Sequence, residues 1–272
     1  IRDNFFLDDV SKKIDVIFHL AALISIPYSY ISPKSYIDTN ILGTYNILNF
    51  AKKNKVKKVF ITSTSEVYGT AQKIPIDESH SLNSQSPYAA SKVAADQLSY
   101  SFYKSYGVPI TILRPFNTFG PLQSNRAILP TIISQILNNE KILKLGNISP
   151  TRDLTYVEDT IDAFICAMKT KKKIIGETIN IGSNFEISIK DILKILKKDF
   201  GYKFTVKIDK ARIRPKNSEV YRLFASNKKS KKLLSWKPKY GGREGFKKAL
   251  KLTIEWYKKN KKKKLTTSKY II

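Results

Sequence analysis

The sequence predicts an α/β fold, a doubly wound parallel sheet followed by a smaller lobe. Three observations predict it. Short apolar segments alternate with longer amphipathic ones through the first half of the 272 residues. The apolar segments end in small or polar residues, as parallel strands do at a ligand-binding edge. After Arg114 a turn-rich segment and shorter elements follow, which indicates an appended lobe.

Each element of the first half follows from its local pattern. Apolar runs predict buried parallel strands at residues 14–22, 56–64 and 108–115. Amphipathic patterns predict helices at residues 32–54 and 86–107. Pro87 suits the first turn of the second helix, and Gly107 suits its end. Because strands and helices alternate, the connections should be right-handed parallel crossovers.

The charge of the chain does not by itself predict a nucleic-acid partner. Lys and Arg number 49 against 22 Asp and Glu, which gives a formal net charge of +27. The lysines are scattered, with dense runs only at residues 171–173 and 257–264, and no nucleic-acid recognition motif accompanies them. We therefore expect no nucleic-acid partner and consider an anionic small molecule the better candidate substrate.

Other residue classes exclude further functions. No stretch is apolar over the roughly 18 residues that a membrane helix needs, so we expect a cytoplasmic protein with no membrane partner. The single Cys166 has helical spacing among apolar residues and should pack in the core. His19 and His80 are far apart in the sequence and predict no metal site, and His19 is expected to be packed rather than catalytic.

Three predicted strands end in polar or small residues. The sequences HLAA, TSTSE and RPFN each close one strand. Because ligands of open parallel sheets bind beyond the carboxyl ends of the strands, these residues should meet in one crevice.

The predicted helix at residues 86–107 carries Tyr88 and Lys92 four residues apart, on one face. A lysine ammonium beside a phenol stabilises the phenolate, so Lys92 is expected to lower the pKa of Tyr88. Such a tyrosine can take the proton of a sugar hydroxyl while hydride leaves the same carbon. Taken alone, the spacing also fits an exposed surface pair.

In this order, the motifs TSTSEVYG, YAASK and RPFNTFGP make the chain resemble the extended short-chain dehydrogenase/reductase family, the NAD-dependent nucleotide-sugar epimerases and dehydratases. The resemblance covers nearly the whole chain. It implies a Rossmann-type fold, NAD as cofactor and a nucleotide-sugar substrate. The catalytic residues that it implies are Thr64, Glu66, Tyr88 and Lys92.

The resemblance also implies a reaction. The triplet of Thr64, Ser65 and Glu66 resembles that of sugar-nucleotide 4,6-dehydratases, whereas epimerases usually lack the glutamate. Tyr88 would remove the O4 proton while the C4 hydride passes to NAD, and the 4-ketone would acidify the C5 proton. Glu66 would take that proton, water would leave from C6, and hydride would return to C6. Ser65 replaces an Asp of the glucose-class enzymes, so Glu66 would also protonate the departing water.

Further residues match binding positions of the family. Those implied at the cofactor, together with Tyr88 and Lys92, are Leu20, Ala21, Ala22, Asn40 and Phe116. Those implied at the substrate, together with Thr64, are Asn117, Arg152 and Arg214; the two arginines would hold the diphosphate. Arg222 is a weaker candidate. For each arginine, an ordinary surface ion pair is the alternative.

The family's glycine-rich turn, which receives the pyrophosphate of NAD, does not occur in this sequence. We therefore expect an N-terminally truncated enzyme that lacks its first βαβ units. The expected divisions are a partial NAD-binding domain at 1–115, a mainly substrate-binding lobe at 116–257 with segments returning to the first domain, and a basic tail at 258–272. The 272-residue chain should bind NAD poorly and expose apolar sheet edges; micromolar affinity by isothermal titration would contradict this.

Within the family, whole phrases look closest to UDP-N-acetylglucosamine 4,6-dehydratases of the legionaminic-acid pathway, among them HLAALISIPYSYISPKSYIDTN and RPKNSEVYRL. Two alternatives stay open, a UDP-hexose 4-epimerase and a non-catalytic basic binding protein. The family commonly pairs through two helices per subunit, so a homodimer is expected through the helix at about residues 33–54 and the helix that carries Tyr88.

Overall fold

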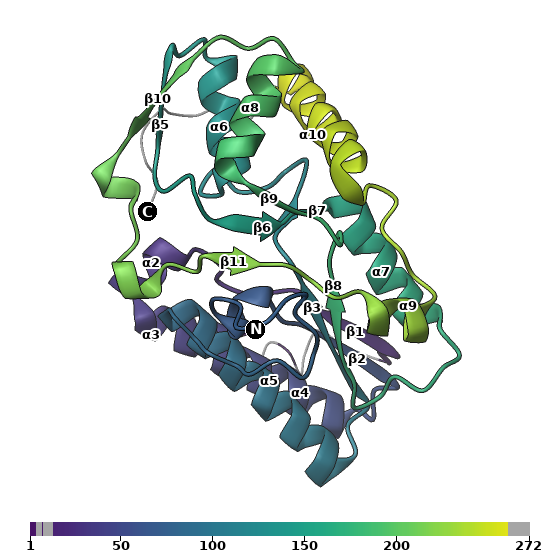
Figure 1. Ribbon diagram of the computed structural model, residues 1–272. Helices are drawn as coiled ribbons and strands as arrows, with labels where there is room; N and C mark the ends of the chain where they lie inside the picture. Colours follow the sequence, from purple (N-terminus) through teal and green to yellow (C-terminus); the bar gives the residue numbers. More distant parts are fainter. Residues whose placement is uncertain (4–6, 8–12, 261–272) are drawn as a thin grey trace.

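The computed structural model describes residues 1–3, 7 and 13–260, which form two lobes (Figure 1). The lower lobe in that view contains a four-stranded parallel sheet with the order β1-β2-β3-β8. Its strands are β1 (Val16–His19), β2 (Lys58–Thr62), β3 (Ile110–Pro115) and β8 (Thr178–Ile181). The first three lie within the predicted strand segments. The fourth comes from the second half of the chain and pairs with β3.

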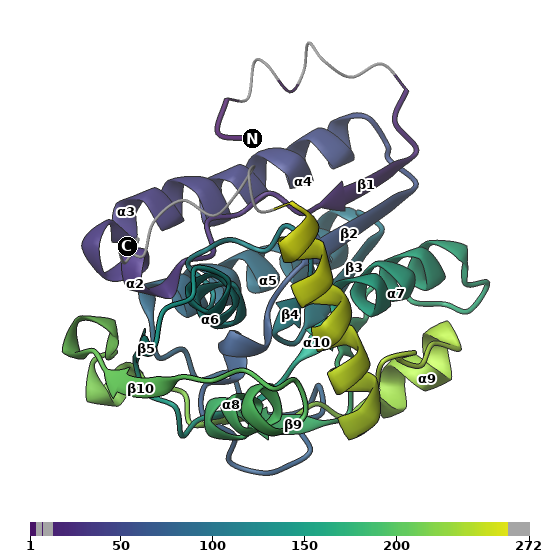
Figure 2. The same cartoon turned by 90° about the horizontal axis from the view of Figure 1, so that it is seen from above.

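Helices cover both faces of this sheet, which makes it doubly wound as predicted. The flanking helices are α4 (Gly43–Lys53), α5 (Pro87–Tyr106), α7 (Val157–Lys169) and α9 (Lys228–Leu234). Val59 and Ile61 of β2 pack in one cluster with residues of α4 and α5. Phe60, which points to the opposite face, packs with residues of α7 and α9. Figure 2 shows α4 and α7 on opposite sides of the strands.

The two predicted helices of the first half are confirmed. The first is one continuous helical run in which α3 (Pro33–Tyr36) passes through a π-helical segment, Ile37–Leu42, into α4. The second is α5. Its Ser86 side chain accepts a hydrogen bond from the backbone N–H of Ala89 at 3.1 Å, and Gly107 ends it with φ +68°.

The upper lobe is built on its own apolar cluster. Its helices are α6 (Ile128–Leu137), α8 (Ile189–Lys198) and α10 (Gly242–Lys259), and its outer strands are β5 (Ile142–Leu145) and β10 (Thr205–Ile208). All three helices and β5 supply residues to this cluster, among them Ile132, Leu145 and Phe246. The clustering explains why these short elements form, since each one buries a single apolar face.

Small sheets lie where the lobes meet (Figure 1). One has the order β11-β6-β9, formed by β11 (Arg222–Leu223), β6 (Thr151–Asp153) and β9 (Glu186–Ser188). The other pairs β4 (Thr118–Phe119) with β7 (Thr155–Tyr156). The helix α2 (Ile26–Ile31) and the 3-10 turns at Ser65–Tyr68, Lys210–Arg212 and Lys216–Ser218 complete the described elements. This junction carries several predicted substrate residues.

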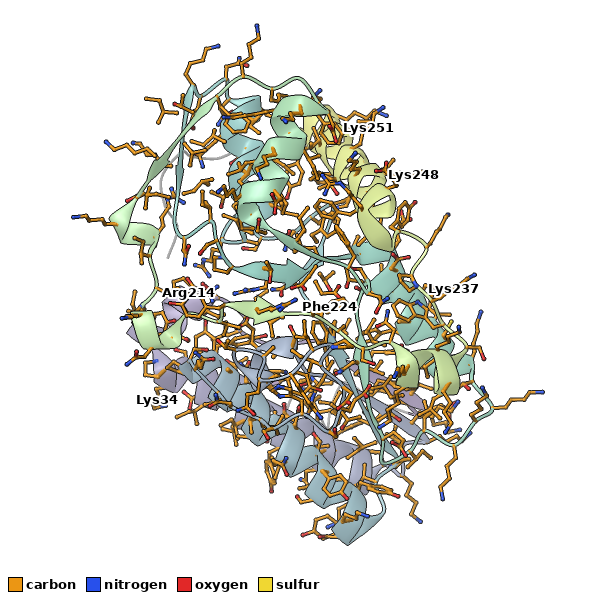
Figure 3. The ribbon with its side chains drawn as sticks, in the orientation of Figure 1. Lys34, Arg214, Phe224, Lys237, Lys248 and Lys251 are labelled. Atoms are coloured by element: carbon orange, nitrogen blue, oxygen red, sulfur yellow. The ribbon has the colours of Figure 1, made fainter. Side chains whose placement is uncertain are left out.

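Several sequence expectations concern the surface. No helix within the described part of the chain has the length and apolar character needed to cross a membrane. Cys166, expected in the core, is only partly buried and packs against the apolar cluster that includes residues of α7. Lys237, Lys248 and Lys251 point outward along one edge of the molecule (Figure 3). Most of the basic tail, residues 261–272, lies outside the described residues.

The strand β1 lies at the edge of the described sheet. Phe18 in this strand is 37% exposed and Leu20 just after it is 63% exposed. The described sheet therefore presents apolar side chains at this edge.

Candidate active site

The carboxyl end of β2 positions the hydroxyl and acid residues of the TSTSE motif. Thr64 caps a 3-10 helix, Ser65–Tyr68, and its Oγ1 accepts a hydrogen bond from the backbone N–H of Glu66 at 3.2 Å. Thr64 and Glu66 are 9% and 5% exposed. The 3-10 turn bends the chain after the strand and so holds both side chains within the molecule.

Tyr88 lies beside this turn. It is the second residue of α5, is 7% exposed, and the hydroxyl of Thr64 lies close enough to its phenol to act on the pKa of that phenol. The negative charge of Glu66 acts to raise the pKa of the same phenol, which places the carboxylate in its neighbourhood. The structure therefore brings three of the four predicted catalytic residues together.

Lys92, the fourth, follows one turn later on α5 and is 3% exposed. Its Nζ donates a hydrogen bond to the carbonyl of Thr62 at 2.7 Å, at the end of β2. Burial lowers the pKa of this lysine, and the nearby carboxylate of Asp96 opposes that shift. Among the described residues no second hydrogen-bond acceptor for this ammonium group is found, so it can donate to a ligand.

The prediction that Lys92 lowers the pKa of Tyr88 is wrong for this structure. Burial raises the pKa of the phenol, the hydrogen bond from Thr64 opposes this, and the negative charge of Glu66 adds to the rise. The reason is geometric, because the ammonium group of Lys92 is directed at the carbonyl of Thr62. Helical spacing alone does not reveal such a competing acceptor.

A buried charge pair supports this face of α5, and the sequence analysis missed it. Asp96, one further turn along, accepts hydrogen bonds from Arg114 of β3 at 2.9 and 3.1 Å and from Ser63 at 2.6 Å. Arg114 also donates to the phenol oxygen of Tyr68 at 2.9 Å. The pair ties α5 to the ends of β2 and β3, so it holds the catalytic helix against the sheet. Arg114 stands in the quoted motif RPFN and Asp96 follows the motif YAASK by four residues, but their pairing has no sequence signal.

The residues predicted at the cofactor differ in their exposure. Leu20 and Ala21 are exposed at the end of β1, and Ala22 is half-buried. Asn40 is fully buried, and its amide bonds the backbone of Leu23 at 2.9 and 3.0 Å. The same amide donates to Ser91, the neighbour of Lys92, at 2.9 Å. Asn40 thus joins the loop after β1 to α5 rather than presenting a free amide.

Phe116 does not reach the surface of this site. It is 1% exposed and packs in a cluster with Val67, Tyr68 and Leu223. His19 is 4% exposed and its Nε2 lies 2.9 Å from the hydroxyl of Thr44. Burial and the charge of Lys92 lower the pKa of His19 to about 4. It is packed, as expected.

The predicted substrate residues converge on one carboxylate. Nη2 of Arg152 lies 3.8 Å from Oε1 of Glu219, and Nη1 of Arg214 lies 3.7 Å from the same oxygen. Arg152 is 8% exposed, and Figure 3 shows Arg214 at the level of β11, between the lobes. Nη1 of Arg214 and Oδ1 of Asn117 are buried and make no hydrogen bond to the described residues. Unused donors and acceptors of this kind suit a polar, anionic ligand.

Arg222, the weaker candidate, has a different role. Its guanidinium is 46% exposed and forms hydrogen bonds to both carboxylate oxygens of Glu186, one of them at 2.9 Å. Arg222 therefore forms an exposed ion pair with Glu186, which joins β11 to β9. Glu219 was missed as a site residue, since its place in the motif RPKNSEV does not show that its carboxylate turns toward both arginines.

The described residues show no metal centre. No three His, Cys, Asp or Glu side chains within residues 1–3, 7 and 13–260 gather closely enough to hold a metal ion.

Comparisons with known proteins fit this geometry. A sequence profile of the GDP-mannose 4,6-dehydratase family matches residues 1–249. The chain belongs to this family. Human dTDP-D-glucose 4,6-dehydratase is 33% identical over 257 residues, which is 92% of this chain and 70% of the relative.

Two solved structures show that the proteins similar to this chain include a 4-epimerase and a 4,6-dehydratase. A UDP-glucuronic acid 4-epimerase from Bacillus cereus, in complex with UDP-glucuronic acid and NAD, aligns with a TM-score of 0.83 and 31% identity, covering 94% of this chain and 78% of that one. A dTDP-glucose 4,6-dehydratase from Streptomyces venezuelae, with NAD bound, aligns with a TM-score of 0.88 and 26% identity, covering 97% and 80%. The fold is the Rossmann-like α/β fold of these enzymes.

Gly69 ends the 3-10 turn that carries Glu66, in a backbone conformation, φ +63° and ψ −157°, that favours glycine. A Cβ here would lie 2.2 Å from the carbonyl oxygen of Asn83. We expect Gly69→Ala to lower the free energy of unfolding by about 3 kcal/mol or more, from strain plus overpacking. Gly107→Ala, at φ +68° with open space around it, should cost only about 1 kcal/mol. Urea unfolding measures both; equal losses would contradict the role of Gly69.

Proposed function

We propose that the protein is an NAD-dependent nucleotide-sugar 4,6-dehydratase that converts UDP-N-acetylglucosamine to its 4-keto-6-deoxy derivative. The observation that carries the proposal is the buried Glu66 beside Thr64 and Tyr88. A 4-epimerase, which changes the configuration at C4 only, needs a tyrosine and a hydroxyl. A carboxylate in the same enclosed place supplies what the removal of water additionally requires, a base for the C5 proton.

Tyr88 and Thr64 act first in the proposed reaction. Thr64 binds the 4-oxygen of the sugar, and the oxygen of Tyr88 takes the proton from it. For this step the phenol must be ionised, and the positive charge of bound NAD together with the ammonium group of Lys92 would offset the burial that raises its pKa. Lys92 has donors left beyond its bond to Thr62 and can donate toward the hydroxyls of a bound ligand. When bound, NAD accepts hydride from C4 and later gives it back at C6.

Glu66 then carries out the elimination. The 4-ketone makes the C5 proton acidic, and the carboxylate takes it. The C6–O bond breaks, and the hydroxyl leaves as water with the proton that Glu66 returns. A solvent proton then adds at C5. Because Ser65 stands where glucose-class enzymes carry an Asp, Glu66 is the acid as well as the base in this scheme.

The nicotinamide end of NAD fits the residues present. The exposed Leu20 and Ala21 offer a surface of small and apolar side chains at the end of β1. Lys92 on α5 has unused donors, and Asn40 fixes the loop after β1 to the same helix. We assign Ala22 to the same surface.

Arg152 and Arg214 are assigned to the diphosphate, and Asn117 to the sugar nucleotide. Arg214→Ala should weaken the binding of UDP about tenfold or more, because a charge-assisted hydrogen bond is lost. Arg222→Ala is the matched control, because that guanidinium is held by Glu186, and it should leave UDP affinity unchanged. Isothermal titration with UDP measures both. If the two variants bind UDP with equal affinity, Arg214 does not hold the diphosphate.

We further propose a cytoplasmic homodimer. Large apolar side chains are exposed on the two helices assigned to pairing, for example Ile37, Leu42 and Tyr45 on one and Tyr100 and Tyr106 on the other, each between 42% and 55% exposed. Pairing of these faces between two copies would remove this area from water. Sedimentation of the protein measures the state directly.

Product analysis tests the proposed function. The full-length protein, incubated with NAD and UDP-N-acetylglucosamine, should give a product lighter by one water. A product of unchanged mass would identify a 4-epimerase, which would use Tyr88 and Lys92 but not Glu66. No conversion, combined with nucleic-acid binding that weakens steeply with salt, would identify the basic binding protein instead.

A further inference from the structure

The segment that carries Arg214 and Glu219 is attached to the rest of the molecule in two different ways. Its continuation, from Val220 through Leu223 to Ala225, is anchored by apolar packing against Val67 and Tyr68. Residues 214–219, here called the arginine segment, have no such anchor; Pro215, Lys216 and Asn217 are exposed. The position of this segment therefore depends on its polar contacts.

Besides the phenol of Tyr30, which lies 2.6 Å from the hydroxyl of Ser218, Gln85 supplies those contacts from the first lobe. Its side-chain Nε2 donates to the backbone carbonyl of Asn217 at 3.1 Å and to that of Glu219 at 3.2 Å. The backbone carbonyl of Gln85 accepts a hydrogen bond from the hydroxyl of Ser218. All three bonds hold the arginine segment, and two of them come from one amide group.

The oxygen of the same amide contacts the chain just after the 3-10 turn Ser65–Tyr68, which carries Glu66 and is here called the catalytic turn. Oε1 of Gln85 accepts the backbone N–H of Thr70 at 2.6 Å, directly after Gly69. The hydroxyl of Thr70 donates to the backbone carbonyl of Glu219 in the segment at 3.5 Å, and it accepts the backbone N–H of Tyr221, just beyond the segment, at 3.1 Å. A polar hollow of about 640 Å³ lies at this junction, lined in part by Thr70, Gln85 and Asn217. Hydrogen bonds rather than apolar packing thus join the two parts.

Gln85 also stands next to the helix that carries Tyr88. It directly precedes Ser86, whose side chain caps α5, and Tyr88 is two residues further on. Gln85 therefore contacts the residue that follows the Glu66 turn and its Gly69 cap, and it holds the segment that bears Arg214. It also directly precedes the residue that caps the catalytic helix.

We infer that Gln85 is a positioning residue that couples the diphosphate-binding arginine segment to the catalytic turn and helix, which rests on the proposed function for the roles of those parts. Its Nε2 sets the distance of the arginine segment from α5. Its Oε1 holds the turn after Glu66. A nucleotide bound at Arg214 is in this way placed in register with Tyr88.

Two substitutions separate the two ends of the side chain. Gln85→Glu keeps an acceptor for the N–H of Thr70 but removes both donors, and it sets a negative charge against the carbonyls of Asn217 and Glu219. We expect it to weaken UDP binding and to raise KM for the nucleotide sugar about tenfold, while kcat changes less than about twofold. Gln85→Ala loses both ends and should also lower kcat. Ser84→Ala, at an exposed neighbouring residue, is the control and should match the wild type.

A merely structural role predicts a different result. In that case the variants would unfold at lower temperature, but folded molecules would keep wild-type KM and kcat, and this outcome would overturn the inference. If Gln85→Glu does not fold, Ser218→Ala replaces it as the test, with Tyr30→Phe as its control, because the hydroxyl of Ser218 contacts both the Gln85 carbonyl and the phenol of Tyr30. Ser218→Ala should weaken UDP binding about threefold or more; unchanged affinity would overturn the inference.

The control at Arg214 distinguishes failure of this inference from failure of the proposed function. If Arg214→Ala weakens UDP binding and Gln85→Glu does not, Gln85 has no positioning role and the diphosphate site stands. If neither variant changes the affinity for UDP, the nucleotide does not bind at the arginine segment. The diphosphate role of Arg214 and the positioning role of Gln85 are then both wrong.

Discussion

Tyr88→Phe should reduce turnover of the nucleotide sugar about a thousandfold, because the group that accepts the first proton is lost. The effect should fall on kcat and kcat/KM alike, since the proton moves only in the reaction. UDP affinity should stay the same, because the phenol lies on α5 rather than among the arginines. Rates measured on the full-length protein with NAD and UDP-N-acetylglucosamine give both constants.

Tyr36→Phe is the matched control for this experiment. The ring of Tyr36 packs edge-on against that of Tyr88, with centroids 6.2 Å apart, and its hydroxyl donates to the backbone carbonyl of Ser25. It is a neighbouring buried tyrosine without access to Thr64, so its loss should change kcat only a few-fold. Equal losses in the two variants would mean that Tyr88 acts through packing alone.

Glu66→Gln should separate the two halves of the reaction. The amide cannot take the C5 proton, so the release of water should slow about a hundredfold or more, while the first oxidation at C4 persists. The shape of the side chain is kept, and the 3-10 turn still receives its cap from Thr64. Product mass followed over time reports the loss of water. Glu158→Gln, at an exposed glutamate on α7, should leave the rate unchanged.

The first half of the fold was predictable because its information is local. Apolar runs gave β1, β2 and β3, and Ser86, Pro87 and Gly107 placed both ends of α5. The pairing of β8 with β3 was not predictable, because Ile112 and its partner Thr178 are far apart in the sequence and the first elements of the upper lobe lie between them. A four-residue strand has little pattern of its own, and its place depends on packing between α7, α9 and the sheet.

The same limit applies to the candidate site. Tyr88 and Lys92 could be placed on one helix face from spacing, and Thr64 and Glu66 at a strand end. The contact of Gln85 with Asn217 spans 132 residues and has no sequence signal. The direction of the Tyr88 pKa was predicted wrongly, because burial and the bond from Lys92 to the carbonyl of Thr62 appear only in three dimensions.

Hydrogen exchange at C5 tests most directly whether a carboxylate removes that proton. The full-length protein, given NAD and UDP-N-acetylglucosamine in heavy water, should yield a 4-keto-6-deoxy product that carries deuterium at C5, and Glu66→Gln should form almost none of it. A dehydrated product formed by Glu66→Gln at the wild-type rate, or a wild-type product without deuterium at C5, would contradict the role assigned to Glu66.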